Sequence, residues 1–343
     1  MPFMPIDVAA HILPAGYYER LQRLPTFYMA QRVKGIPCLY DLGIRFRIMD
    51  RFPGYRQILS LAIPPLDRLG SPEATADFAR LANDELAAIV DAHPDRFAGA
   101  WAGLPLNHPD ASLRELERIS RAPAFTGIQV YSNVAGRPLD EPATLQVIEE
   151  AIRCGLPILL HPARGATDHP DYAGEDRARY DLWSIFGWPY ETTIAMARLV
   201  FTGLFDRHPD AVIIAHHLGA MAPYFAGRID NGYTAFGTRG EDPPPGQPAA
   251  TLVHPPQWYF PRFYADTALS AAAQAIRFGI GFFPNDHVFF GSDTPFDREG
   301  GSWFIRETIA ALDACGLDPA RRRMIDEENI RRVLARRESA ARA

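Results

Sequence analysis

Short apolar runs alternate along the chain with longer segments whose apolar residues recur at helical spacing. The first run covers residues 6–13 and ends at Pro14, which cannot continue an ordinary strand or helix. Further strand-like runs lie near residues 57–62, 97–104, 125–131, 156–161, 211–216, 262–267 and 287–292. Helices are expected at about 72–92, 110–120, 142–153, 192–205, 223–233, 270–279, 302–314 and 326–336. The alternation predicts parallel strands, because parallel neighbours are usually joined by a crossover helix.

Eight strand candidates in this order favour a closed (β/α)8 barrel, the TIM barrel of the α/β class. We expect a single domain over residues 1–343, since barrels of this kind often exceed 250 residues. Three segments break the rhythm and predict a distorted barrel. An irregular but ordered insertion is expected at about 15–54, after the first strand, and long loops at about 163–191 and 236–261 are expected over the barrel mouth.

The first strand contains a histidine whose surroundings follow from strand geometry. Successive side chains of a strand point to opposite faces, so Asp7, Ala9 and His11 are expected on one face, with His11 at its polar end. A lone buried histidine is more often a hydrogen-bonded core residue than a ligand. Taken alone, this stretch therefore favours His11 as a hydrogen-bonded core residue. Evidence for a ligand has to come from the rest of the chain.

Polar residues end several of the predicted strands, which is where TIM barrels carry their chemistry. His11, His161, the pair His216 and His217, and Asp293 all occupy such positions. Imidazoles and a carboxylate that meet above a barrel suit a divalent metal such as zinc, with an open position for water or substrate. The alternative is that His161 and Asp293 are hydrogen-bonded caps, and that one of the two adjacent histidines points away and packs.

Composition and charge narrow the class of protein. The chain is 47% hydrophobic and carries a formal net charge of −6, so nucleic-acid binding has little support. Cys38, Cys154 and Cys315 are widely spaced, which suggests neither a disulfide framework nor a cysteine metal cluster. We find no signal-peptide pattern and no apolar run long enough to span a membrane, so a cytoplasmic enzyme without a membrane partner is the default expectation.

The segment from Arg45 to Arg51 concentrates positive charge in the expected insertion. It contains three arginines, Arg45, Arg47 and Arg51. One interpretation is a solvated helix face, and the other is an anion clamp, because guanidinium binds carboxylate through two parallel hydrogen bonds. The sequence pattern leaves both open.

These motifs together resemble the amidohydrolase superfamily, in its branch of aminocarboxymuconate semialdehyde decarboxylase and related aromatic-acid decarboxylases. The likeness covers essentially the whole chain in the family's order. It is carried by Asp7-Val8-Ala9-Ala10-His11-Ile12-Leu13-Pro14, Arg45-Phe46-Arg47-Ile48-Met49-Asp50, Leu160-His161-Pro162, His217-Leu218-Gly219-Ala220-Met221-Ala222-Pro223, Gly227-Arg228-Ile229 and Gly291-Ser292-Asp293-Thr294-Pro295-Phe296, and more loosely by residues 328–334.

The resemblance implies a metal centre with an acid/base residue. His11, His161 and Asp293 would bind a divalent metal, zinc first and manganese or iron as alternatives. His217 would be the acid/base residue beside the metal-bound water, and Asp293 would be catalytic as well as a ligand. The spacing of His217 to Pro223 and to Arg228 fits the family pattern better than that of His216.

The resemblance also implies how an acidic substrate is held. Arg45 or Arg47 would bind the carboxylate of a small molecule, and Arg228 would reach the site of a neighbouring subunit, which implies a homodimer. Aromatic residues would line a flat apolar pocket, although plain packing is an equal alternative for the tryptophans; they are Trp183, Trp188 and Phe296.

One position departs from the family pattern. The family has His-x-His where this chain has Ala9-Ala10-His11, and a methyl group cannot ligate a metal. Three protein ligands plus water, a lower affinity, or a substitution engineered at Ala9 would each explain this. The first hypothesis is a metal-dependent decarboxylase acting on a small aromatic or unsaturated carboxylic acid. The alternatives are a metal-dependent hydrolase cleaving a C–C or C–N bond, and a catalytically impaired barrel kept as a partner subunit.

Overall fold

Eight parallel strands form one sheet in the computed structural model, which describes residues 5–24, 33–236 and 252–342. Each strand pairs with the next along the chain. The strands are β1 (Ile6–Ile12), β2 (Arg56–Leu61), β3 (Phe97–Gly103), β4 (Phe125–Tyr131), β7 (Ile158–His161), β8 (Ile213–Ala215), β9 (Tyr264–Asp266) and β10 (Val288–Phe289). A small antiparallel hairpin, β5 (Asn133–Val134) and β6 (Arg137–Pro138), follows β4.

Hydrogen bonds between the first and last strands close the sheet. The amide of Val8 donates to the carbonyl of Phe290 at 2.9 Å, and the amide of Asp293 donates to the carbonyl of Ala9 at 3.0 Å. A parallel bridge also pairs Ala10 with Thr294. The predicted (β/α)8 barrel is therefore confirmed, and its seam lies between β1, which carries His11, and the segment after β10, which carries Asp293.

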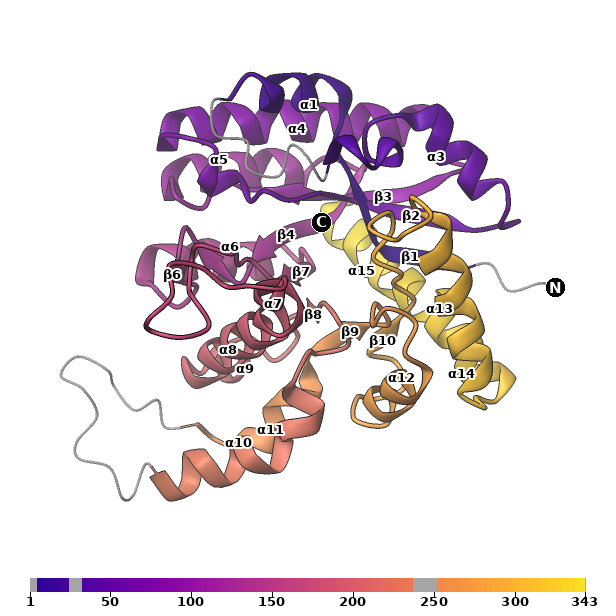
Figure 1. Ribbon diagram of the computed structural model, residues 1–343. Helices are drawn as coiled ribbons and strands as arrows, with labels where there is room; N and C mark the ends of the chain where they lie inside the picture. Colours follow the sequence, from indigo (N-terminus) through magenta and orange to yellow (C-terminus); the bar gives the residue numbers. More distant parts are fainter. Residues whose placement is uncertain (1–4, 25–32, 237–251, 343) are drawn as a thin grey trace.

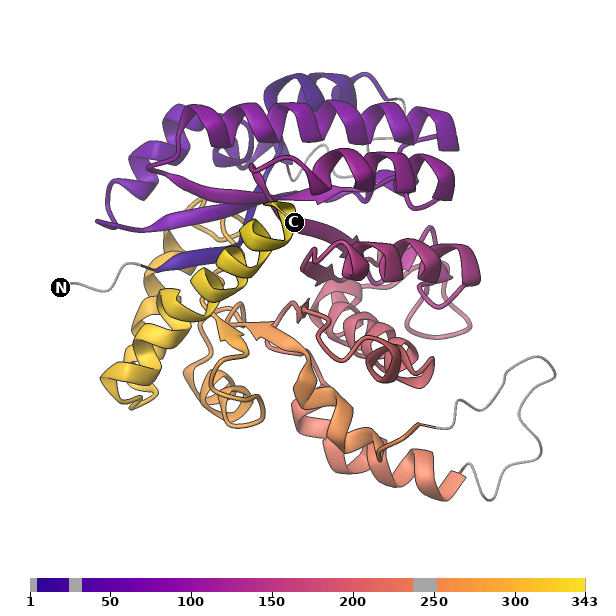
Figure 2. The same cartoon turned by 180° about the vertical axis from the view of Figure 1, so that it is seen from behind.

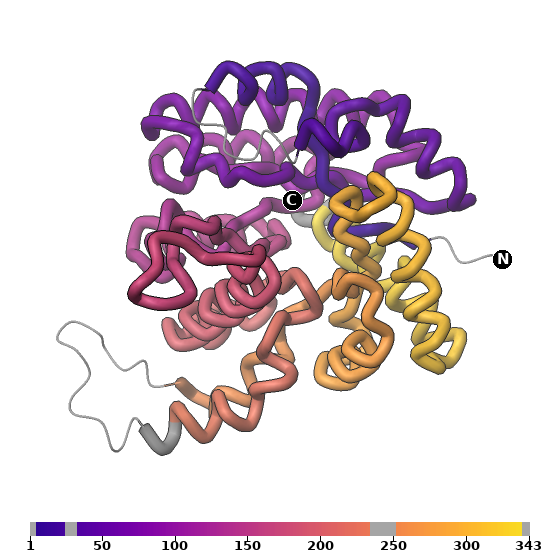
Figure 3. The backbone as a smooth tube through the Cα atoms, in the orientation of Figure 1, coloured from indigo at the N-terminus to yellow at the C-terminus, as the bar shows by residue number. Residues whose placement is uncertain are grey.

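Helices connect the strands and surround the barrel (Figure 1). They are α1 (Ala15–Gln22), α3 (Leu42–Met49), α4 (Pro72–Ala92), α5 (Pro109–Ser120), α6 (Pro142–Arg153), α7 (Leu182–Ile185), α8 (Gly187–Phe201), α9 (Leu204–Arg207), α10 (Ala222–Phe236), α11 (Pro256–Tyr259), α12 (Ala273–Ile280), α13 (Ser302–Ala314), α14 (Pro319–Arg323) and α15 (Asn329–Arg342). Figure 3 shows α10 and α11 projecting away from the barrel. No helix in these ranges is both long enough and apolar enough to cross a lipid bilayer.

Two predicted segments differ from the structure. The insertion at about 15–54 is not irregular, because α1 and α3 form in it, and Asp41 caps α3 by accepting a hydrogen bond from the amide of Ile44. The helix predicted at 192–205 is two helices, α8 and α9, because Gly203 between them has a φ of +74°. Parts of the predicted insertion and of the loop at 236–261, namely residues 25–32 and 237–251, lie outside the described residues.

Apolar side chains fill the barrel interior, as in other barrels of this kind. The cluster contains residues from six of the strands and two from α15; they are Ile6, Val8, Ile58, Trp101, Leu159, Ile214, Phe289, Ile330 and Val333. The Trp101 indole donates to the carbonyl of Val8 at 2.8 Å, which satisfies its buried N–H. Figure 2 shows α15, in yellow, crossing in front of the strands. This packing leaves the opposite, carboxyl ends of the strands for chemistry.

A bulge in β1 changes the predicted facing of its residues. The pairing register between β1 and β2 shifts between Asp7 and Ala10. Val8 packs in the barrel interior, and His11, three residues further on, also faces inward toward His161. Strict alternation would put Val8 and His11 on opposite faces, so the prediction that Asp7 and His11 share a face is wrong. The extra residue of the bulge is the physical reason.

Candidate metal centre

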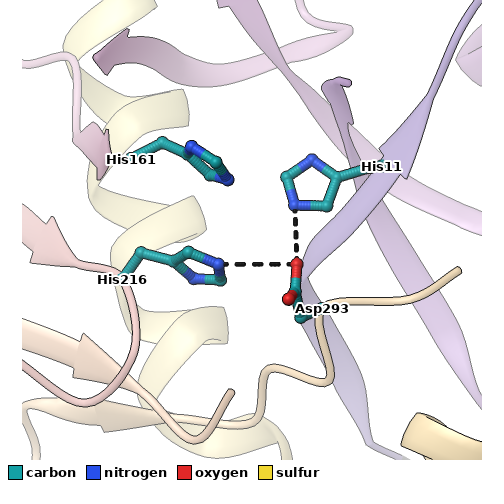
Figure 4. A group of neighbouring side chains, drawn as sticks. All are labelled: His11, His161, His216 and Asp293. Carbon is teal, nitrogen blue, oxygen red and sulfur yellow. Dashed lines mark ion pairs between the residues drawn. The ribbon is translucent and has the colours of Figure 1, made fainter. Parts of the chain in front are cut away.

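Four side chains meet at the carboxyl ends of the strands (Figure 4). His11 and His161 are the last polar residues of β1 and β7, His216 follows β8 directly, and Asp293 follows β10. One donor atom from each of the four lies within 4.8 Å of the others. The Nε2 atoms of His11 and His216 lie 3.1 Å and 3.6 Å from Oδ1 of Asp293. The barrel thus gathers three imidazoles and one carboxylate from four separate strand ends.

Each imidazole of this group uses its Nδ1 atom in a contact with a neighbouring oxygen. The contacts are His11 with the Ser60 hydroxyl at 3.0 Å, His161 with the Pro162 carbonyl at 2.8 Å, and His216 with Asp266 Oδ2 at 2.6 Å. The Nε2 atoms point into the group (Figure 4), and Nε2 of His11 and of His216 is buried without a hydrogen-bond partner. Metal-binding histidines show this arrangement, in which an outer partner fixes the tautomer.

The donor set fits a divalent metal ion. Three imidazole nitrogens and a carboxylate oxygen are ligands that zinc, manganese and iron accept. The side chains of His11 and His216 are 1% and 0% exposed, so unpaired nitrogen atoms there would be costly without an ion. His11, His161 and Asp293, the residues that sequence reasoning brought together, lie in this group, and His216 joins them.

Electrostatic interactions in the group keep the carboxylate ionised. Burial alone would raise the pKa of Asp293, but the neighbouring imidazoles of His11, His216 and His217 hold it well below its usual range. Burial and the neighbouring imidazoles lower the pKa of His161 well below its usual value. These directions describe a negative carboxylate and a neutral His161, the protonation states in which both can bind a cation.

His216 has the opposite shift. Burial disfavours its charged form, but the carboxylates of Asp266 and Asp293 outweigh burial and raise its pKa to about 10. Asp266 is fully buried, and its pKa is lowered because the opposing effect of burial is outweighed by the charge and hydrogen bond of His216. The two side chains therefore form a buried hydrogen-bonded pair directly behind the metal-binding atoms.

His217 lies beside the group rather than inside it. Its Nε2 atom is 3.8 Å from Oδ2 of Asp293, and its ring lies parallel to that of Trp188, with centroids 6.4 Å apart. Burial and the neighbouring His216 lower its pKa. The expectation that one of the two histidines packs away is wrong, because β8 ends at Ala215 and His217 has a φ of +59°, which turns both rings toward Asp293.

The predicted arginines occupy three different environments. Arg45 is 1% exposed; its Nη1 donates to Gln57 at 2.7 Å, and its Nη2 donates to the carbonyl of His11. Arg47, on the same helix, is exposed, and so is Arg228 on α10. Arg45 thus supports the strand that carries His11. The binding of a substrate carboxylate by Arg45, Arg47 or Arg228 remains a prediction.

Two of the three predicted aromatic residues border the group. The Phe296 ring lies 5.3 Å from that of His11, and the Trp188 ring lies 6.1 Å from that of His161. Trp183 is one layer further out, where it packs edge-on against Trp188 at 5.5 Å. Flat aromatic rings therefore lie against two of the donor histidines, His11 and His161.

Sequence reasoning missed Asp266 and assigned His216 no role. Asp266 is the last residue of β9, and the rule that was applied to the other strand ends would have found it. If Gly291 carried a side chain, its Cβ atom would lie 2.7 Å from Cβ of Asp266 and 3.3 Å from Cβ of Ala9. Only glycine allows the segment after β10 to pass so close, and Ala9 and Asp266 both lie next to it.

A buried network underlies both ends of the seam. Asp7 accepts hydrogen bonds from the amides of Ala9 at 3.0 Å and Ser292 at 3.1 Å, and from the hydroxyls of Tyr55 and Ser292. Burial raises its pKa to about 6 in spite of these bonds. Asp7 thereby ties the strand of His11 to the segment that presents Asp293.

Comparison with known sequences identifies relatives over most of the chain. The family described as Amidohydrolase matches residues 6–336. Gamma-resorcylate decarboxylase of Rhodococcus jostii strain RHA1 is 30% identical over 321 residues, which cover 90% of this chain and 90% of that protein. The 2-amino-3-carboxymuconate-6-semialdehyde decarboxylase of Dictyostelium discoideum is 29% identical over 260 residues, covering 75% of this chain and 67% of that protein.

Solved structures share the fold. A crystal structure of 2,6-dihydroxybenzoate decarboxylase in complex with 2,6-dihydroxybenzoate has a TM-score of 0.77 and 26% identity, covering 96% of this chain and 99% of that chain. A dihydroxybenzoic acid decarboxylase from Polaromonas sp. JS666, with bound manganese and the inhibitor 2-nitroresorcinol, has a TM-score of 0.76 and 24% identity, with 96% of each chain covered.

Proposed function

Because the chain belongs to the amidohydrolase family, we propose that it is a metal-dependent decarboxylase that removes CO2 from a small aromatic carboxylic acid. The observation that carries the proposal is the group formed by Asp293 and three imidazoles at the mouth of the barrel, in which each imidazole is held through its Nδ1 atom by a neighbouring oxygen. The relatives at 30% identity are decarboxylases, which favours this reaction over the hydrolysis that the same residues would allow.

His11, His161 and Asp293 would hold the metal. When bound, a divalent ion supplies a positive charge that polarises substrate oxygens and stabilises negative charge as it develops. Zinc and manganese both suit nitrogen and oxygen donors, and manganese is bound in one decarboxylase of the same fold. We propose manganese or zinc, to be decided by metal analysis.

His217 would move the proton that replaces the carboxylate. Its lowered pKa leaves it neutral near neutral pH, so Nε2 can accept a proton from water and pass it to the ring carbon. The new C–H bond takes an electron pair of the ring; the bond from that carbon to the carboxylate then breaks, and its electron pair restores the aromatic ring. In sum, one carboxylate and one proton give one C–H bond and one CO2. Trp188 and Phe296 would pack on the flat ring of the substrate and exclude water.

A homodimer would complete the substrate site. Arg228 is exposed on the projecting helix α10, so it is available to a second copy of the chain. Tyr224 on α10 and Phe278 on α12 are 76% and 55% exposed, and their rings lie 6.2 Å apart. Apolar exposure of this kind is typical of subunit contacts. We also propose a cytoplasmic location, which suits the three free cysteines.

The test is product analysis with metal-loaded protein. A panel of hydroxybenzoates and unsaturated acids is incubated with the chain in water enriched in 18O, with the His217→Ala variant as control. We expect release of CO2 and a product one carboxyl group smaller, with no 18O in the organic product. Incorporation of 18O into that product would instead establish hydrolysis, and absence of turnover with bound metal across the panel would contradict both activities.

A further inference from the structure

We propose that His216 is the fourth protein ligand of the metal and takes the place of the imidazole that position 9 lacks. The inference rests on the proposed function in one respect, namely that the group of donors binds a metal. It concerns which residues complete the site once Ala9 contributes nothing. Sequence reasoning left three protein ligands, and the structure assigns a fourth from a different strand.

The geometry of His216 is that of a ligand. Its side chain is 0% exposed, and its Nδ1 is held by Asp266 at 2.6 Å. Nε2 has no hydrogen-bond partner and lies 3.6 Å from Oδ1 of Asp293, inside the set of atoms that approach one another within 4.8 Å. A carboxylate behind the imidazole fixes the tautomer and increases the basicity of the free nitrogen.

His217 lacks these features although it is the next residue. Its Nδ1 is buried without a hydrogen-bond partner, so no outer group fixes its tautomer. Its side chain is 14% exposed, and the group of mutually close donor atoms does not include it. The two histidines therefore have different roles: His216 is positioned to bind the ion, and His217 is available for proton transfer.

Position 9 lies near Asp266, the residue that holds His216. The methyl group of Ala9 and the Cβ of Asp266 both flank Gly291, at 3.3 Å and 2.7 Å from the built Cβ position there. Asp266 is the residue that holds His216. Ala9 therefore lies close to the residue that positions His216, so the missing imidazole and the proposed ligand belong to the same part of the site.

X-ray absorption spectroscopy of the zinc-loaded or manganese-loaded wild-type chain tests the assignment without a variant. Multiple scattering from imidazole rings counts the histidines on the metal. We expect three, His11, His161 and His216, and we expect the same three in the His217→Ala variant. Two imidazoles in the wild type, or loss of one in His217→Ala, would overturn the assignment. A wild-type chain that binds neither metal would instead overturn the proposed function, and the assignment with it.

Affinity measurements on matched variants provide the second test. His216→Ala should weaken zinc binding, measured by competition with a chelator, by more than about tenfold, since even outer partners of metal ligands contribute about 10–100-fold. Ala9→His in the same chain should recover most of this loss, whereas His217→Ala should change affinity by less than about threefold. Full affinity in a His216→Ala variant that keeps its far-ultraviolet circular dichroism spectrum would overturn the assignment.

Discussion

The Nδ1 atom of His216 lies 2.6 Å from Oδ2 of Asp266, and both side chains are completely buried. The other oxygen of Asp266 accepts hydrogen bonds from the amides of His217 at 3.1 Å and Ala268 at 3.0 Å. Backbone N–H groups can only donate hydrogen bonds. Any side chain that replaces Asp266 without moving the backbone must therefore keep an acceptor oxygen at the Oδ1 position. The orientation of the carboxylate, and with it the tautomer of His216, is therefore determined by the backbone amides that follow β8 and β9.

This relationship predicts the effect of Asp266→Asn. The asparagine oxygen would face the two amides, so its NH2 group would face His216 and drive the imidazole proton to Nε2, where it blocks the metal. We expect metal affinity to fall by about 10–100-fold or more, with metal content measured after equilibrium dialysis. Asp286→Asn, at a carboxylate that is 54% exposed, is the matched control and should bind normally. Normal affinity in Asp266→Asn would mean that His216 does not depend on this contact.

His217→Ala should abolish turnover while metal content stays nearly intact. In the wild type the neutral imidazole is the active form, so kcat/KM should fall as pH decreases through a value below 6.5, because burial and His216 lower the pKa of His217. Metal content and a pH–rate profile provide the measurement. Loss of the metal in this variant would reassign His217 as a ligand, and full activity would remove it from the site.

Arg45 and Arg47 offer a matched pair on one helix. Arg45→Ala leaves the His11 carbonyl and the Gln57 side chain without their buried donor, and each unsatisfied group costs about 1–3 kcal/mol. We expect urea unfolding to give a loss of about 3 kcal/mol for Arg45→Ala and less than about 0.5 kcal/mol for the exposed Arg47→Ala. A stable Arg45→Ala variant with a raised KM would instead favour the carboxylate clamp.

Asp7 should make stability depend on pH in the acid range. Its folded pKa of about 6 lies above its usual 3.8, so between these values the folded state binds more protons than the unfolded state. The unfolding free energy should therefore fall as pH rises from 4 to above 6, by about 3 kcal/mol for this group. Asp7→Asn cannot titrate, so the difference in unfolding free energy between the two proteins should change by that amount. A difference that is constant with pH would refute the buried, shifted carboxyl.

Arg228 tests the homodimer. If it acts across the interface, Arg228→Ala and His217→Ala should each be inactive, yet a hybrid dimer should contain one intact site. Random mixing of equal amounts should then restore about a quarter of the wild-type activity. The mixed species is verified with two affinity tags. No restoration in a verified hybrid would place Arg228 in the site of its own subunit or outside any site.

The sequence alone determined the architecture and the family. Apolar runs at residues 125–131 and helical spacing at 72–92 are local signals, and the structure has β4 and α4 at these bounds. The family resemblance, read from motifs at the strand ends, is confirmed by the match over residues 6–336. Strand ends could be predicted because a parallel barrel brings the carboxyl end of every strand to one face.

Only the tertiary structure decided which side chains complete the site. The bulge in β1 depends on pairing with β2, so period-two reasoning could not assign the facing of Asp7. The turn that brings His216 and His217 to the same carboxylate needs a positive φ that residue types do not announce. The contact between His216 and Asp266 joins residues 50 apart in sequence. The local sequence pattern determines the helices and strands, whereas the metal-binding side chains are brought together by contacts between distant segments. For that reason the proposed fourth ligand could be identified only from the tertiary structure.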